Sequence, residues 1–165
     1  MCAVEFCKTQ QSANHRAKIE KIELREAKKR VKSRAQWRRE AQSTFNAYIR
    51  ERDKADPCIS CGRYHSGQWH AGHYRTTGAH PELRFNEDNC HKQCAPCNNH
   101  LSGNLIRYRE RLIEKIGIER VEDLENYNRP NKYTIDELSA IKATYKQRLN
   151  ELRSQAVEKS VDNSA

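Results

Sequence analysis

The sequence predicts a mostly helical α+β protein whose small core is held by a zinc ion and extended by helices at both ends. Two Cys-x-x-Cys pairs, Cys58/Cys61 and Cys94/Cys97, supply the four thiolates of a tetrahedral structural zinc site. Only 36% of the 165 residues are hydrophobic and 32% are charged, so a large apolar core is not expected. We divide the chain into a basic helical extension, a zinc-bound core, and C-terminal helices with a disordered tail: residues 1–56, 57–117 and 118–165.

The N-terminal extension is dominated by positive charge. Residues 15–40 contain eleven Lys or Arg and four Glu but no Gly or Pro, which favours one continuous helix. Because apolar residues are sparse, this helix is either a solvated surface element or an arm that lies along phosphates, and the two are compatible. Cys2 and Cys7, which precede it, are either surface thiols or half of a second zinc knuckle.

A helix with an apolar face is expected to lead into the core and to pack on it. Its apolar residues recur at helical spacing: Trp37, Ala41, Phe45, Tyr48 and Ile49. Pro57 disfavours helical geometry at Asp56, so the helix should end there.

Within the core, a short strand is expected at residues 68–74, and a second short strand is expected to begin at Leu83 and Phe85. Asn98 is expected to open a helix that Gly117 ends. The apolar face of that helix comprises Leu101, Leu105, Tyr108, Leu112 and Ile116.

The C-terminal region predicts a short helix over residues 119–126 and a longer one that starts after Thr134. Thr134 and Glu137 form a capping-box pattern at the start of the longer helix. Its apolar stripe comprises Leu138, Ile141, Tyr145, Leu149 and Leu152. This stripe either packs on the chain's own core or forms the seam of a homodimer. The tail from Val157 is expected to be disordered.

The overall charge favours a polyanionic partner. The formal net charge is +9 and the isoelectric point is about 9.3, although a ribosomal or membrane-surface partner would give the same balance. No apolar run approaches the roughly 18 residues needed to span a bilayer. Residues 1–10 lack the apolar core of a signal peptide, so we expect a cytoplasmic protein whose thiols stay reduced.

The order of motifs around the cysteines resembles the HNH, or ββα-metal, endonuclease module. His73, Asn89 and Asn98 take the three positions that name the module, with Asn in the third place. The wider sequence resembles the NinG family of lambdoid phages, the Rap-type recombination nucleases, in the runs CISCG, AGHYRTTGAH, RFNEDN, HKQC and CNNHLSGNL. The resemblance covers roughly Tyr48 to Leu152. It implies a metal-dependent DNA endonuclease of phage recombination that acts on branched intermediates, such as Holliday junctions and D-loops, in a bacterial host.

The candidate chemical roles follow from what phosphodiester hydrolysis needs, which is a base for water and a cation for developing negative charge. His73 suits the base because imidazole is largely neutral near pH 7. The resemblance implies that Asn89 orients the His73 region and that Asn98 offers a carbonyl oxygen to Mg²⁺. His70 stands where the family favours an acid, and as a second metal ligand it would shift the preference toward Mn²⁺.

Each of these residues also has a purely structural interpretation. His73 could be a core histidine, Asn89 a turn residue and Asn98 a helix N-cap. Cys90, His91 and His100 could compete for zinc, whereas His65 and His80 are interpreted as exposed loop residues. Five basic residues near the site either contact phosphates or only solvate the surface: Arg75, Arg84, Lys92, Arg107 and Arg109.

The rival function class is a non-catalytic zinc module that binds branched or duplex DNA. It needs the four thiolates and the basic surface but neither His73 nor a second metal. A third class is a regulatory protein that pairs through its C-terminal helix.

Overall fold

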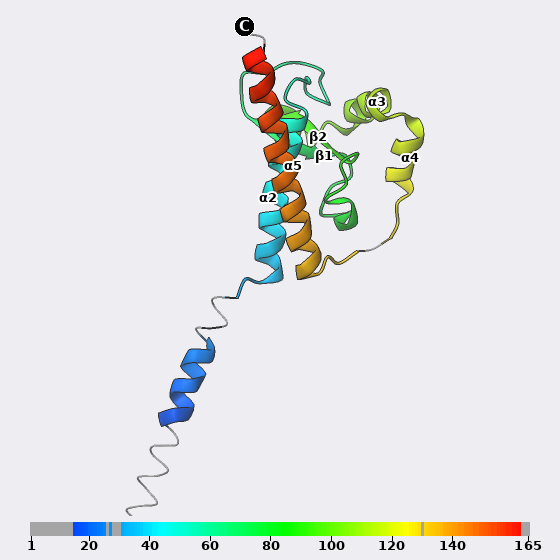
Figure 1. The fold of residues 1–165 in the computed structure, drawn as a ribbon. Helices are drawn as coiled ribbons and strands as arrows, with labels where there is room; N and C mark the ends of the chain where they lie inside the picture. The colour runs from blue at the N-terminus through cyan, green and yellow to red at the C-terminus, as the bar shows by residue number, and fades with distance from the viewer. Residues whose placement is uncertain (1–14, 26, 28–30, 130, 163–165) are drawn as a thin grey trace, which may run out of the picture. The chain divides into compact units, whose positions relative to one another are not determined.

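The computed structural model describes residues 15–25, 27, 31–129 and 131–162, with side chains described up to residue 156 (Figure 1). Cys2 and Cys7 lie outside the described residues. The chain divides into two compact units between Gln36 and Trp37, and each unit is described by itself.

The basic stretch is not one continuous helix. Residues 15–25 are helical, residues 31–33 are not, and α2 (Arg34–Arg52) starts afresh. A capping box marks this start, because Ser33 Oγ accepts from the Gln36 amide (3.2 Å) and Gln36 Oε1 accepts from the Ser33 amide (2.7 Å). The Ser-x-x-Gln pattern was present in the sequence and contradicts the single helix predicted there.

In the second unit, α2 and α5 (Ile135–Asp162) lie side by side (Figure 1). Their buried apolar residues form one cluster: Ala41, Phe45, Tyr48 and Ile49 from α2, and Leu138, Tyr145 and Leu149 from α5. The stripe suggested for a homodimer seam is therefore buried within one chain, and a dimer itself stays a prediction. The predicted capping box is confirmed, because Thr134 N donates to Glu137 Oε2 (2.7 Å) and Glu137 N donates to Thr134 Oγ1 (3.2 Å). The disordered tail predicted from Val157 is wrong as far as Asp162, where α5 ends.

Two antiparallel strands form a hairpin at the centre of this unit: β1 (Trp69–His73) and β2 (Cys90–Cys94). The first matches the predicted strand. The second predicted strand is wrong, because Pro81–Leu83 is a 3-10 turn (η1) and Phe85 lies in a turn. The side chain of Phe85 joins the α2–α5 cluster. The sequence of β2, CHKQC, lacks a strand's alternation because all five residues are buried.

The hairpin presents two faces, because residues paired across the strands share a face. The register pairs Trp69 with Cys94, Ala71 with Lys92 and His73 with Cys90, and these residues form the first face. Ala71 and Cys90 pack there against the α2–α5 cluster. The second face carries the pairs His70–Gln93 and Gly72–His91.

The second face is covered by α3 (Leu105–Ile116), whose Tyr108 hydroxyl donates to the carbonyl of Gly72 (2.9 Å). A close-packed contact also requires glycine at position 72, since a Cβ there would lie 2.1 Å from Gln93 Oε1. A short helix, α4 (Ile118–Asn126), follows α3 after Gly117, as predicted. The cluster under α3 and α4 comprises Ile59, Tyr74, Leu83, Tyr108, Leu112, Val121 and Leu124.

The helix predicted to open at Asn98 begins only at Leu105. Asn98 lies in a π-helical turn, η2 (Pro96–His100), and Ser102, Gly103 and Asn104 all have positive φ, which interrupts a right-handed helix. Leu101 is 57% exposed and so does not belong to a buried face. None of the described helices is long and apolar enough to cross a membrane.

Candidate functional site

The four predicted zinc ligands come together at one end of the hairpin. The Sγ atoms of Cys58, Cys61, Cys94 and Cys97 all lie within 4.8 Å of one another. Tetrahedral zinc with Zn–S bonds of about 2.3 Å places its sulfur atoms roughly 3.8 Å apart, and the Cys61 and Cys94 sulfur atoms are separated by 3.9 Å. The predicted ligand set is thus confirmed as a cluster that fits a structural zinc ion.

Hydrogen-bond donors surround this cluster, as a site with four thiolates requires. The Cys94 amide donates to Cys58 Sγ (3.4 Å), and Asn104 Nδ2 donates to Cys97 Sγ (3.7 Å). His65 Nε2 lies 3.3 Å from Cys61 Sγ, so His65 can donate to the cluster rather than stand apart in a loop. Within the described part of the chain, Cys90, His91 and His100 are not members of the cluster.

His73 lies at the opposite end of the hairpin, where β1 ends. Its Nε2 is 3.0 Å from the carbonyl oxygen of Arg84. A carbonyl can only accept, so Nε2 carries the proton and the lone pair is on Nδ1. Nδ1 is 3.7 Å from Cys90 Sγ, and the ring centroid lies 6.2 Å from that of Phe45. The contacts therefore select one tautomer of His73.

The surroundings of His73 keep it neutral. Burial lowers the pKa of His73, the positive charge of Arg84 lowers it further, and the hydrogen bond to the Arg84 carbonyl does not offset them. Burial raises the pKa of the Cys90 thiol strongly, so this group stays protonated and can donate to His73 Nδ1. At pH 7 the imidazole is therefore an uncharged proton acceptor.

Asn89 is fully buried and connects the two ends of the loop after β1. Its Oδ1 accepts from the Arg75 amide (2.7 Å), while its Nδ2 donates to the carbonyls of Arg75 (2.9 Å) and Leu83 (3.2 Å). Leu83 precedes Arg84, whose carbonyl binds His73. Asn89 is thus placed to fix the backbone that orients the imidazole, which goes beyond the role of a simple turn residue.

The structure does not bring His70 and His73 together. They are three residues apart on one strand, so they project from opposite faces of the hairpin. His70 Nε2 is buried and has no hydrogen-bond partner among the described residues. Asn98 Nδ2 donates to Asn99 Oδ1 (2.9 Å), and Asn104, not Asn98, is the N-cap residue of α3. In the described residues, the four cysteines are the only group of three or more His, Cys, Asp or Glu side chains able to share a metal.

The five basic residues predicted to contact DNA differ in their surroundings. Lys92 is buried, and its Nζ donates to the carbonyl of Lys54 (2.7 Å). Arg109 pairs with Glu125 and Arg107 with Glu110. The Arg75 guanidinium lies 2.8 Å from His80 Nε2, and the Arg84 guanidinium donates to Gln42 Oε1 (3.1 Å) and to the carbonyl of Thr77 (2.8 Å).

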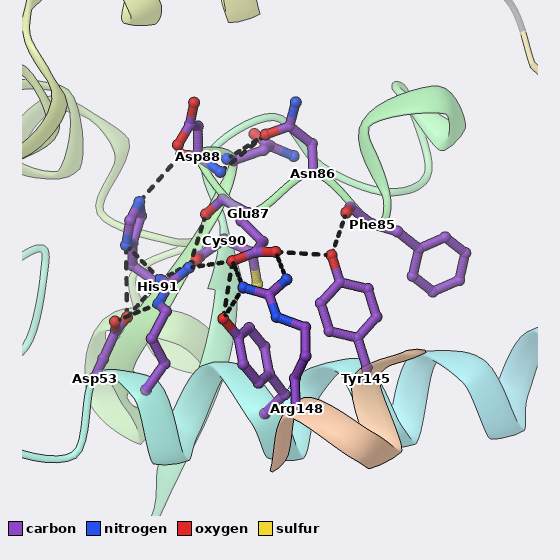
Figure 2. A network of polar contacts seen from close by, with 12 residues as sticks. Asp53, Phe85, Asn86, Glu87, Asp88, Cys90, His91, Tyr145 and Arg148 are labelled. Atoms are coloured by element: carbon purple, nitrogen blue, oxygen red, sulfur yellow. Dashed lines mark hydrogen bonds and ion pairs between the residues drawn. The ribbon is translucent and has the colours of Figure 1, made fainter. Parts of the chain in front are cut away.

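Sequence reasoning missed a polar network beside the His73 end of the hairpin (Figure 2). Glu87 accepts hydrogen bonds from the hydroxyls of Tyr48 (3.1 Å) and Tyr145 (3.0 Å), and it pairs with Arg148. One carboxylate therefore joins α2, α5 and the loop before β2. Burial opposes ionisation of Glu87, but the hydrogen bonds from Arg148 and Tyr145 outweigh it and lower the pKa.

A second carboxylate, that of the buried Asp53, completes the network. Asp53 accepts from the Arg52 guanidinium (2.7 Å) and from the Lys92 amide (3.0 Å). Burial opposes its ionisation, but hydrogen bonds from His91 and Arg52 hold the pKa of Asp53 well below its usual range. Arg52 also donates to the carbonyl of Cys90 (2.9 Å), so this ion pair connects the end of α2 to β2 (Figure 2). These long-range contacts left no local signal in the sequence.

The fold and the cysteine cluster define a mostly helical α+β protein with an antiparallel hairpin and four clustered cysteines that could bind a metal. The chain belongs to the NinG family, because the family model described as "Bacteriophage Lambda NinG protein" matches residues 3–155.

Individual relatives agree with this assignment. The chain is 53% identical to Protein ninG of Escherichia phage lambda over 134 residues, which cover 81% of this chain and 65% of that protein. It is 52% identical to Protein ninG of Salmonella phage P22, again over 81% of this chain and 65% of the relative, and 52% identical to that of Escherichia phage 933W, over 81% and 66%. The chain therefore spans slightly less than two thirds of the length of these relatives. No solved structure matches it.

Proposed function

We propose that this protein is a metal-dependent, structure-selective DNA endonuclease of the HNH type that acts on branched recombination intermediates. The single observation that carries the proposal is the state of His73, which is neutral and held in one tautomer by the Arg84 carbonyl. This tautomer leaves the lone pair on Nδ1, which is the proton acceptor that a general base requires. The resemblance of His73, Asn89 and Asn98 to the HNH module supplies the reaction class.

The proposed reaction is hydrolysis of a phosphodiester. His73 Nδ1 takes a proton from water, the water oxygen attacks phosphorus, the bond from phosphorus to the 3′ oxygen breaks, and the leaving 3′ oxygen takes up a proton from solvent. The products are a 5′-phosphate and a 3′-hydroxyl. Asn89 acts through the backbone by keeping the Arg84 carbonyl in place, so we regard it as a positioning residue. The Cys90 thiol contacts the same nitrogen, so its hydrogen bond to Nδ1 must break or be shared when the water binds there.

A hard cation belongs to the proposal as well. Mg²⁺ usually keeps several waters and binds few protein groups together with substrate phosphates, so the lack of a closed cage is compatible with it. The sequence assigns the cation to Asn98 and His70, but His70 projects from the face of the hairpin opposite His73 and Asn98 directly follows the cluster residue Cys97, so we do not place the cation of the His73 site on these two residues. When bound, the cation would offset negative charge on the phosphate and on the leaving oxygen.

The alternative is a non-catalytic zinc module that binds DNA. Two observations favour it: the Cys90 thiol lies against His73 Nδ1, and the described residues contain no second cluster of metal-binding side chains. The two proposals separate in one assay, in which a labelled four-way junction, a D-loop and a linear duplex are incubated with Mg²⁺, Mn²⁺ or EDTA. Cleavage of branched DNA with either metal supports the enzyme. Tight binding to junctions without any cleavage would reject it.

A further inference from the structure

A hollow in the surface lies along α2, near the loop that contains Arg84. Its volume is about 500 Å³, which is large enough for one or more phosphate groups, and all of its lining residues belong to the second unit. The lining residues are Arg38, Arg39, Gln42, Ser43, Asn46 and Arg84, which we call the arginine groove. No carboxylate lines it.

Among the residues that the structure describes, no carboxylate forms an ion pair with any of the three arginines of the groove. Arg84 donates to Gln42 Oε1 (3.1 Å) and to the carbonyl of Thr77 (2.8 Å), both of which are neutral. Arg38 and Arg39 are exposed and form no ion pair with a carboxylate in the part of the chain that the structure describes. Burial lowers the pKa of Arg84, and the charge of Arg38 lowers it further. These positive charges repel one another, and an anion bound between them would offset that repulsion.

The rest of the lining suits the backbone of a nucleic acid rather than an apolar ligand. Gln42, Ser43 and Asn46 contribute amide and hydroxyl groups, and Gln42 Nε2 donates to Asn46 Oδ1 (2.7 Å). Side chains of these types, together with arginine, bind phosphate and sugar oxygens in protein–DNA interfaces. Phosphodiester oxygens would satisfy both the charge and the hydrogen-bond donors of the groove.

Arg84 connects the groove to the proposed base. Its guanidinium lines the groove, while its carbonyl accepts from His73 Nε2 (3.0 Å). We infer that the arginine groove binds the phosphodiester backbone of the DNA strand that flanks the phosphate presented to His73. This inference rests on the proposed function for the position of the scissile phosphate, but binding in the groove does not require cleavage.

The test measures binding of a labelled four-way DNA junction in EDTA, between 50 and 200 mM salt, by wild-type protein and by the double variant Arg38→Gln/Arg39→Gln. Each lost phosphate contact should reduce the slope of log K against log salt by about 0.9 on duplex DNA, or about 0.7 on a single strand. We expect the double variant to lose one to two contacts. The control is Lys146→Gln/Arg153→Gln, which removes the same charge from exposed positions of α5. Thermal unfolding verifies that both variants are folded.

The possible outcomes separate this inference from the proposed function. If both double variants lower the slope equally, only net charge matters and the groove is rejected. An unchanged slope in Arg38→Gln/Arg39→Gln, or no binding by the wild type, also rejects it. If the groove variant alone loses slope but wild-type protein never cuts, the groove stands and the nuclease fails. His73→Ala should keep the full wild-type slope.

Discussion

The two ends of the β1–β2 hairpin, whose strands have five residues each, are built in different ways. At the Trp69–Cys94 end, four cysteines from two short sequence motifs converge within 4.8 Å of one another. At the His73–Cys90 end, the imidazole binds the carbonyl of Arg84 and lies beside Phe45 of α2. The buried Asn89 supports this carbonyl by donating to the carbonyl of the preceding residue, Leu83. The zinc end is thus specified by local spacing, whereas the histidine end depends on segments that are distant in sequence.

This difference predicts unequal sensitivity to mutation. Structural zinc contributes about 10–16 kcal/mol of folding free energy in small domains. A single hydrogen bond at the histidine end contributes about 0.5–1.5 kcal/mol. The zinc end should therefore determine whether the core folds, and the histidine end should determine how fast it reacts.

The largest effect is expected at the zinc end. Cys58→Ser or Cys94→Ser should release zinc and unfold the core, because three thiolates cannot hold the ion as four do. Cys90→Ala is the matched control, since Cys90 is equally buried but lies outside the cluster. The measurements are zinc content and thermal unfolding. Native stability in either Ser variant, or purified wild-type protein without zinc, would contradict the assignment.

At the histidine end, His73→Ala should lower the rate of junction cleavage by about 10²- to 10⁴-fold, the usual contribution of a general base. Zinc content and junction binding should stay at the wild-type level. His100→Ala, which alters an exposed histidine, should cut normally. Single-turnover cleavage measures the effect. A His73→Ala protein that cuts at the wild-type rate would remove His73 as the base.

Asn89→Ala should lower both the free energy of unfolding and the rate of junction cleavage. Removing the side chain leaves the part-buried amide and carbonyl of Arg75 and the buried carbonyl of Leu83 without their partner. Unsatisfied buried groups destabilise by about 1–3 kcal/mol each, so a loss of roughly 2–4 kcal/mol is expected. Urea unfolding measures it, with zinc content as the check that the other end is intact. Wild-type stability would show that Asn89 does not hold the loop.

The smallest effect concerns pH. Burial lowers the pKa of both His73 and His91 from the usual 6.5, so the folded protein binds fewer protons than the unfolded chain between the lowered values and 6.5. Stability should therefore be complete above about pH 6.5 and should fall as the pH drops toward the lowered pKa values. Urea unfolding at pH 7.5, 6.5 and 5.5 measures this, with zinc content followed in parallel. In His73→Gln the dependence should weaken, and a wild-type protein equally stable at all three values would contradict the prediction.

Features with a local signal were predictable from the sequence. The twin cysteine pairs, the first strand, the Thr134 capping box and the glycine after α3 each depend on a few adjacent residues. Two further signals were present but went unused. Ser33-x-x-Gln36 marks a helix start, and the three-residue separation of His70 and His73 already places them on opposite faces of a strand.

Other features had no local signal. The sequence of β2, CHKQC, does not alternate between apolar and polar residues. Both faces of the strand are buried, each by a different part of the chain, so no such alternation is needed. The interruption before α3 depends on positive φ at Ser102 and Asn104, which few sequences would reveal. The network at Glu87 joins Tyr48, Tyr145 and Arg148, and only the packing of α5 on α2 brings them together.

The pairing of α2 with α5 has a consequence for how the protein is made. The apolar face of α2 is translated before the cysteine-containing region, whereas Leu138, Tyr145 and Leu149, which cover it, are translated after that region. The same delay separates Glu40 from its partner Lys142 (2.6 Å). All four cysteines of the cluster have been translated once Cys97 is made, before the α5 side chains that cover Phe45 and its neighbours exist. A chain that ends before Leu138 should therefore expose the apolar face of α2 and be prone to aggregation.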